Sequence, residues 1–215
     1  MTLIPRGCLK TTTITVGLAL QFFLVYQDEA LLLDSETSTN SVNFLMEIKG
    51  HMTGNEAYRE IYRAIWGVYP DHHSNDKNWR WTNSYVDVGA RRNKDKTPSI
   101  DTGGVDTTKN SRHYHLIIND DLHSDQNTGT KEQIEKVKTH YRLQDPLLNP
   151  GCPTVIIGTR WTDDDLYSMI MEEHADDFNF IVRSAKSPSG ELLYPSRLDE
   201  EELQAKRKEL GGSLS

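Results

Sequence analysis

The sequence predicts an α/β protein, with a three-layer α/β/α architecture around a mainly parallel central sheet. Three short apolar runs carry this prediction: Ala30–Asp34, Tyr114–Asp120 and Thr154–Gly158. Continuous apolar runs are typical of strands buried on both faces, whereas half-exposed strands alternate apolar and polar residues. Segments with helical spacing separate these runs, as in a series of βαβ units. Polar residues follow the strands, and ligands bind at that edge of an open α/β sheet.

Composition narrows the class of protein. The chain has 215 residues, of which 36% are hydrophobic and 26% charged, so we expect a globular chain with one sizeable domain. Its net charge of −8 at pH 7 gives no general attraction to nucleic acid, and a DNA contact requires a local basic patch or partner subunits. The two cysteines, Cys8 and Cys152, form no zinc pattern and no disulfide framework, which fits a reducing compartment.

The first 26 residues predict a strand, a loop and a helix. Thr2–Ile4 ends a strand, Pro5–Thr12 forms the loop, and Thr13–Tyr26 is an apolar helix. A charged segment followed by an apolar one is also typical of a secretory signal peptide. However, Gln21 interrupts the apolar run and no small-x-small cleavage site follows it. We therefore interpret the run as a core helix.

A loop that carries Lys-Thr between a strand and a helix is the P-loop arrangement. Backbone N–H groups and the helix N-terminus attract phosphates, Lys10 reaches the β- and γ-phosphate oxygens, and the Thr11 hydroxyl ligates Mg²⁺. Both outer glycines of the standard pattern are missing, because Ile4 and Leu9 stand in their places. Taken alone, the loop is better explained as a turn before a core helix.

Two further strand ends carry polar residues. Asp120 and Asp121 end the second apolar run, and Gly158–Arg160 ends the third. An acid pair alone is usually an ordinary acidic turn. Beside a phosphate-binding loop, however, the first acid can hold Mg²⁺ and the second can orient a water. In a parallel sheet these strand ends converge with the Lys10 loop on one site.

The remaining elements follow from periodicity and turn residues. Thr162 is the predicted N-cap of one helix, the polar cluster Ser35–Thr39 caps another, and Thr102–Gly104 is interpreted as a flexible link. The other predicted helices are Ser41–Met52, Tyr58–Trp66, Thr130–Tyr141, Asp163–His174 and Leu198–Gly211, and the other predicted strands are Ser84–Val88 and Phe178–Val182.

Three motifs together resemble the ATPase domain of tailed-bacteriophage terminase large subunits, the motors that move double-stranded DNA into procapsids. They are Pro-Arg-Gly-x-x-Lys-Thr-Thr at 5–12, His-Tyr-x-Leu-Ile-Ile-x-Asp-Asp-Leu at 113–122, and Gly-Thr-Arg-Trp-x-x-Asp-Asp-Leu-Tyr at 158–167. The segments 194–198 and 209–211 are similar to the end of that family's ATPase region. The motifs cover nearly the whole chain in the family's order. The third is the most specific.

The resemblance implies a P-loop NTPase fold of the ASCE type, with ATP and Mg²⁺ as cofactors, and it implies a role for each motif residue. Arg6 senses or stabilises the γ-phosphate, and Asp121 activates the attacking water. Thr11 and Asp120 hold Mg²⁺. Nucleotide binding falls to Gly7, Cys8, Leu9, Lys10, Thr11 and Thr12, and the coupling of nucleotide state to DNA movement falls to Gly158, Thr159 and Arg160.

The resemblance also implies domains, partners and location. We expect a P-loop ATPase domain over 1–197, and a helix or linker over 198–215 that leads toward a nuclease domain. Nuclease activity is not expected in this chain, because no acidic cluster of the ribonuclease-H type is present. The expected partners are double-stranded DNA, the portal protein and the small terminase subunit, with a homo-oligomeric ring in the host cytoplasm and no membrane. His115 departs from the family, which often has Asp there.

Two alternatives remain open at this stage. A helicase-like P-loop ATPase shares Lys10, Thr11 and Asp120 but does not need the Gly158–Tyr167 motif. A non-catalytic remnant that acts only in assembly needs none of them. A neighbouring subunit could supply an arginine in trans, for which the candidates are Arg91, Arg92 and Arg112.

Overall fold

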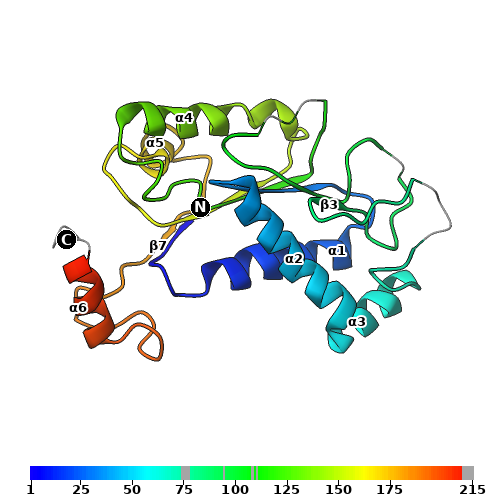
Figure 1. Cartoon of the computed structure of the whole chain (residues 1–215), viewed down its shortest axis with the longest axis horizontal. Helices are drawn as coiled ribbons and strands as arrows, with labels where there is room; N and C mark the ends of the chain where they lie inside the picture. The colour runs from blue at the N-terminus through cyan, green and yellow to red at the C-terminus, as the bar shows by residue number, and fades with distance from the viewer. Residues whose placement is uncertain (74–77, 94, 108, 110, 210–215) are drawn as a thin grey trace.

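A central sheet lies between two layers of helices in the computed structural model, which describes residues 1–73, 78–93, 95–107, 109 and 111–209 (Figure 1). One face of the sheet is covered by helices from the first third of the chain, and the other by α4 (Lys131–Arg142) and α5 (Leu166–Glu173). The predicted α/β class with a mostly parallel sheet and helices on both faces is therefore confirmed.

The sheet has seven strands in the order β3-β4-β2-β5-β6-β1-β7. Strand β3 pairs antiparallel with β4, and the other neighbours pair in parallel. Strand β6 lies between β1 and β5, so the strand before the Lys10 loop does not touch the strand that carries the acid pair. The strands are β1 Thr2–Leu3, β2 Leu31–Ser35, β3 Tyr85–Val86, β4 Ile100–Thr102, β5 Leu116–Asp120, β6 Thr154–Gly158 and β7 Ile181–Val182.

The first helix begins two residues earlier than predicted, at Thr11. Its first part, η1, is a π-helix over Thr11–Val16, and it continues without a break as α1 over Gly17–Val25. Single π-turns are rare and concentrate at functional sites. The remaining helices are α2 Ser38–Gly54, α3 Glu56–Trp66, the short 3₁₀ turn η2 Asp145–Leu147 and α6 Glu200–Glu209. The predicted helix end at Gly211 lies outside the described residues.

Side-chain caps explain where several helices begin. Thr37, in the predicted polar cluster, accepts a hydrogen bond from the Asn40 amide at the start of α2. Thr130 caps α4 in a reciprocal pair with Gln133. The prediction that Thr162 caps the next helix is wrong. Asp165 is the cap of α5 and accepts a hydrogen bond from the Ser168 amide, because the residues before it form a turn.

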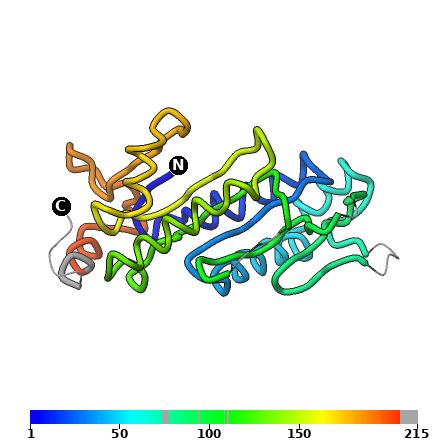
Figure 2. Tube along the Cα trace, turned by 90° about the horizontal axis from the view of Figure 1, so that it is seen from above, coloured from blue at the N-terminus to red at the C-terminus, as the bar shows by residue number. Residues whose placement is uncertain are grey.

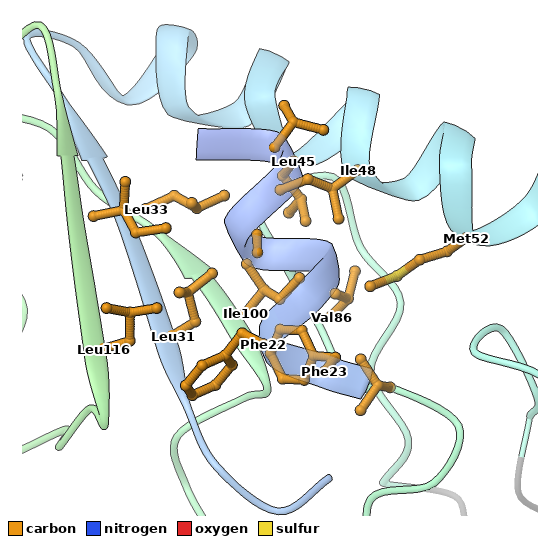
Figure 3. Packing of buried hydrophobic residues seen from close by; sticks show 14 of the residues in the cluster. Phe22, Phe23, Leu31, Leu33, Leu45, Ile48, Met52, Val86, Ile100 and Leu116 are labelled. Carbon is orange, nitrogen blue, oxygen red and sulfur yellow. The ribbon is translucent and has the colours of Figure 1, made fainter. Parts of the chain in front are cut away.

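The larger hydrophobic core lies between the sheet and the helices η1, α1, α2 and α3. Figure 3 shows Leu31 and Leu33 of β2 and Leu116 of β5 on the side of the sheet that faces α1 and α2. Helix α2 contributes Leu45, Ile48 and Met52 to this core, and Phe44 of the same helix is only partly buried. The residues labelled in that view are Phe22, Phe23, Leu31, Leu33, Leu45, Ile48, Met52, Val86, Ile100 and Leu116.

The interpretation of Thr102–Gly104 as a flexible link is wrong. Thr102 ends β4, a strand that the sequence did not predict, and Gly103 and Gly104 are buried. A Cβ atom on Gly103 would lie 2.8 Å from an Asp34 carboxylate oxygen, and one on Gly104 would lie 2.3 Å from the Ser38 amide nitrogen. These glycines let the chain pass close to β2 and to the start of α2.

Different segments of the chain lie at the two ends of the molecule. Figure 2 shows the segment from β7 to α6 gathered beside the N-terminus at one end of the molecule, with α3 at the other. None of the helices in the described residues is both long and apolar enough to span a bilayer. The two-part division at residue 197 stays a prediction.

Gly158, the last residue of β6, tests the packing between the sheet and α5. A Cβ atom there would lie 2.2 Å from Cζ of Tyr167, whose side chain is fully buried. We expect Gly158→Ala to lower the free energy of unfolding by about 1–3 kcal/mol, because overpacking a tight core forces side chains from their rotamers. Chemical denaturation measures this change.

Gly50→Ala in α2 is the matched control, since nothing lies within 4 Å of the position that a Cβ atom would take there. It replaces an exposed helical glycine, so it is expected to raise stability by roughly 0.5–1 kcal/mol. Equal effects of the two substitutions would contradict the packing assigned to Gly158.

Candidate functional site

Lys10 joins three strand ends that are distant in the sequence. Its ammonium group donates hydrogen bonds to Oδ1 of Asp121 at 2.8 Å and to Oγ1 of Thr159 at 2.6 Å. The Lys10 side chain is only 6% exposed, whereas lysine is almost never buried unless it is paired. The loop after β1, the turn after β5 and the turn after β6 thus meet at one nitrogen, as the sequence predicted.

The loop before Lys10 has the backbone of a glycine-rich turn without most of its glycines. Gly7 has φ 86°, and Leu9 has φ 55° in the left-handed region. Leu9 occupies the position of a glycine in the standard P-loop pattern, and a non-glycine residue there costs on the order of 1–2 kcal/mol. The Leu9 carbonyl accepts a hydrogen bond from the Thr13 amide, which ties the loop to the helix. Leu9 therefore adopts a left-handed conformation that glycine adopts more easily.

Asp120 is a fully buried carboxylate that is only partly satisfied. Its Oδ2 accepts a hydrogen bond of 2.6 Å from Oγ1 of Thr15, and its Oδ1 is buried and has no hydrogen-bond partner. Burial raises the pKa of Asp120 above its usual range, while hydrogen bonds from Thr15 and Thr11 act in the opposite direction. A buried carboxylate oxygen without a partner is costly unless a cation binds it.

Asp121 differs from its neighbour because the backbone turns there. Its φ of 47° is left-handed, its amide donates to the Ile157 carbonyl at 2.8 Å, and its carbonyl accepts from the Glu36 amide at 3.2 Å. The side chain is 32% exposed and carries the ion pair with Lys10. The adjacent acids are therefore held differently: Asp120 is buried under η1, and Asp121 faces Lys10.

The segment after β6 contacts the Lys10 loop at a second point. The guanidinium of Arg6 lies over the ring of Trp161, with Cζ 4.4 Å from the ring centre. The Ile4 amide also donates to the Gly158 carbonyl at 3.2 Å. A cation over an aromatic face is worth roughly 0.5–2 kcal/mol. Together with the contact between Lys10 and Thr159, this couples the two loops mechanically.

Some of the predicted residues lie away from Lys10. Arg160 donates to Oγ of Ser168 at 2.9 Å and lies 3.6 Å from Asp163, so its side chain turns toward α5. Arg6 and Gly7 are exposed on the loop, Thr12 is exposed on η1, and Cys8 is partly buried.

His115 and two of the candidate arginines have other roles. His115 Nε2 lies 2.6 Å from Oε2 of Glu29. His115 immediately precedes β5, so it lies at the opposite end of that strand from Asp120. Arg112 forms an ion pair with the fully buried Asp101. Arg91 donates to Oγ of Ser99 and to the Thr97 carbonyl.

Three residues of the site were missed in the sequence. Thr15 is buried against Asp120, and its only signal is a polar residue at a core position of an apolar helix. Glu36 follows β2, and its backbone amide donates a hydrogen bond to the Asp121 carbonyl. The carboxylate of Glu36 accepts a hydrogen bond from the Ser124 hydroxyl. No sequence signal connects Glu36 to Ser124, because the pair is formed by the parallel register of β2 and β5.

Comparisons with known proteins leave the family open. Neither the models of known protein families nor the sequences of curated proteins give a match to this chain. The site is therefore interpreted from its own geometry.

Asp120 provides a stability test that is independent of any activity. Because burial raises its pKa in the folded protein, the folded state binds the proton more tightly than the unfolded state does. Stability from this group is thus lost as pH rises from the ordinary carboxyl pKa through the raised one. At pH 7 without divalent cations, Asp120→Asn is expected to raise the free energy of unfolding by about 0.5–2 kcal/mol.

Denaturation at several pH values measures this difference, which should vanish below about pH 4, where the ordinary carboxyl is protonated. Asp163→Asn, which replaces a fully exposed acid, is the matched control and should leave stability unchanged. A variant at position 120 that is less stable than the parent at pH 7 would contradict the buried, uncompensated charge.

Proposed function

We propose that this chain is a P-loop ATPase domain that hydrolyses Mg·ATP, and that it acts as the motor domain of a terminase large subunit. The observation that carries the proposal is the Lys10 ammonium, which lies between Asp121 and Thr159 beside an unsatisfied Asp120. A lysine at a loop-to-helix junction next to two strand-end acids is similar to the set of groups that P-loop NTPases use for phosphoryl transfer.

The strand order supports the ASCE type of this fold. That type is defined by an additional strand between the strand before the P-loop and the strand that carries the acids. Here β6 occupies that position between β1 and β5, and it ends in Gly158, next to Thr159. The ligand edge of the sheet therefore has the three strand ends that the proposal needs.

The phosphates of the nucleotide are assigned to the Lys10 loop. An ammonium group has three donors, and Asp121 and Thr159 accept two of them, which leaves one for a phosphate oxygen. The first backbone N–H groups of a helix have no intrahelical partner, so those at the N-terminus of η1 are assigned to the phosphate oxygens. Arg6, exposed on the same loop, is assigned to the γ-phosphate.

The residues present fit a magnesium ion. Mg²⁺ is usually held by one or two carboxylates, by substrate phosphates and by water, so a large protein cage is not needed. The buried Oδ1 of Asp120 is an unsatisfied hard oxygen, and the Thr11 hydroxyl is the second protein ligand of the proposal. Within the described residues, no three His, Cys, Asp or Glu side chains gather into a metal site. The ion supplies charge neutralisation on the β- and γ-phosphates.

Hydrolysis is proposed to proceed by in-line attack. A water oxygen bonds to the γ-phosphorus while the bond from that phosphorus to the β–γ bridging oxygen breaks, which releases ADP and inorganic phosphate. The Asp121 carboxylate orients the water and takes its proton. Lys10 and Arg6 stabilise the charge on the transferred group, so catalysis is mainly positioning and electrostatics.

The coupling to DNA movement is assigned to Gly158, Thr159 and Arg160. Thr159 contacts Lys10 directly and Arg160 contacts α5, so this segment connects the phosphate loop to a helix of the outer layer. Translocation of double-stranded DNA, the ring assembly and the portal and small-subunit partners rest on the motif resemblance alone. With a net charge of −8, the DNA contact requires a ring of subunits or a local basic surface.

Lys10→Ala and Asp121→Asn test the site. Each is expected to abolish DNA-stimulated ATP hydrolysis, because the first removes the phosphate cation and the second the acid that accepts the proton. Phosphate release with and without double-stranded DNA measures the rate. Both residues lie at the ligand edge of the sheet and outside the hydrophobic core, so circular dichroism should show an intact fold.

Lys131→Ala, which changes an exposed lysine at the start of α4, is the matched control and should keep the parent rate. Near-normal turnover in either site variant would reject the site assignment. Absence of both nucleotide binding and turnover in the parent protein would favour the non-catalytic remnant.

A further inference from the structure

Thr15 forms the closest side-chain contact of Asp120. Its Oγ1 donates a hydrogen bond of 2.6 Å to Asp120 Oδ2, and both side chains are fully buried. The lysine-adjacent Thr11 is the residue that the standard motif places beside the metal. Thr15 lies four positions further along η1 and belongs to no part of that motif.

The four-residue spacing along η1 places Thr15 on the same side of the helix as Thr11. Residues four apart on a helix lie on nearly the same face, and the hydroxyls of both Thr11 and Thr15 interact with the Asp120 carboxylate at the end of β5. Thr13, between them, is exposed on the other side. Asp120 therefore meets two threonine hydroxyls of one helix, one near the loop and one deeper in the core.

The Thr15 hydrogen bond makes the two Asp120 oxygens unequal. Oδ2 is fixed by Thr15, while Oδ1 is buried without a partner. A carboxylate held at one oxygen cannot rotate freely, so its second oxygen keeps one direction. Mg²⁺ requires near-ideal octahedral geometry at about 2.0–2.1 Å, and it is therefore sensitive to the direction of each ligand.

We propose that Thr15 is a positioning residue for the metal site: by binding Asp120 Oδ2 it aims Asp120 Oδ1 at the divalent cation that accompanies the nucleotide. The inference rests on the proposed function, because it needs a Mg·nucleotide complex at Lys10. Groups that orient a metal ligand typically change metal affinity by roughly 10–100-fold when they are removed.

Thr15→Val tests the inference, since valine has nearly the shape of threonine and lacks the hydroxyl. We expect the Mg²⁺ concentration that half-saturates nucleotide binding to rise by roughly 10–100-fold. ATP affinity without Mg²⁺ should not change, because Lys10 is untouched. Isothermal titration of the nucleotide at a series of Mg²⁺ concentrations separates these quantities, and the electron paramagnetic resonance signal of Mn²⁺ gives a readout independent of turnover.

Three further variants sharpen the test. Thr15→Ser keeps the donor and should match the parent protein, whereas Thr15→Cys has a weak donor and should give an intermediate shift. This series keeps the inference testable if the valine variant does not fold. Thr13→Val, the same substitution on the exposed side of η1, is the matched control and should have no effect.

The outcomes separate the inference from the proposed function. Parent-like Mg²⁺ dependence in Thr15→Val overturns the inference and leaves the ATPase proposal standing. An equal loss of affinity with and without Mg²⁺ assigns Thr15 a purely structural role and also overturns it. A parent protein without Mg²⁺-dependent nucleotide binding overturns both.

Discussion

The hydrogen bonds of the Lys10 ammonium are the interaction on which the arrangement of this site depends. They connect the loop after β1 to Asp121 after β5 and to Thr159 after β6. Because β6 separates β1 from β5, backbone pairing does not join the first loop to the acid pair. A side chain with the length of lysine is what crosses that strand. The strained φ of Leu9 is tolerated in a loop that delivers this side chain.

The left-handed φ of Asp121 gives the adjacent carboxylates of Asp120 and Asp121 different surroundings. Asp120 ends β5 with its side chain under η1, whereas the left-handed φ of Asp121 turns the next carboxylate toward Lys10. Asp121 is thus partly exposed and paired with the Lys10 ammonium, whereas Asp120 is buried and forms no ion pair in the described residues. The buried Asp120 charge opposes folding, and such opposition between stability and site chemistry is typical of functional sites. The Thr15 hydroxyl offsets only part of it, because it satisfies only one of the two carboxylate oxygens.

The sequence predicted what depends on long apolar runs and on the convergence of parallel strand ends. The strand Thr154–Gly158 was predicted to the residue, and Lys10, Asp121 and Thr159 were expected at one edge. The sequence did not predict the features that depend on contacts between distant segments. Strand β4 has three residues, of which the middle one is the buried, ion-paired Asp101, so no apolar pattern marks it. The contact between Thr15 and Asp120 joins residues that are 105 positions apart in the sequence, so no local pattern reveals it.

The contacts between the loop that contains Lys10 and segment 158–161 also connect a ligand site at Lys10 to helix α5. Segment 158–161 contacts the Lys10 loop through Thr159 and through Trp161, whose ring lies against the Arg6 guanidinium. The Lys10 ammonium has a third N–H group, so it can donate a hydrogen bond to an anion while it keeps its bond to Thr159. The guanidinium of Arg6, in contrast, already lies against the Trp161 ring. An anion at Lys10 that attracted Arg6 would weaken the contact with Trp161, while the hydrogen bonds from Lys10 to Thr159 and from the Ile4 amide to the Gly158 carbonyl would remain. Under the proposed function, Arg160, which follows Thr159 and donates a hydrogen bond to Ser168, is the link from this segment to α5.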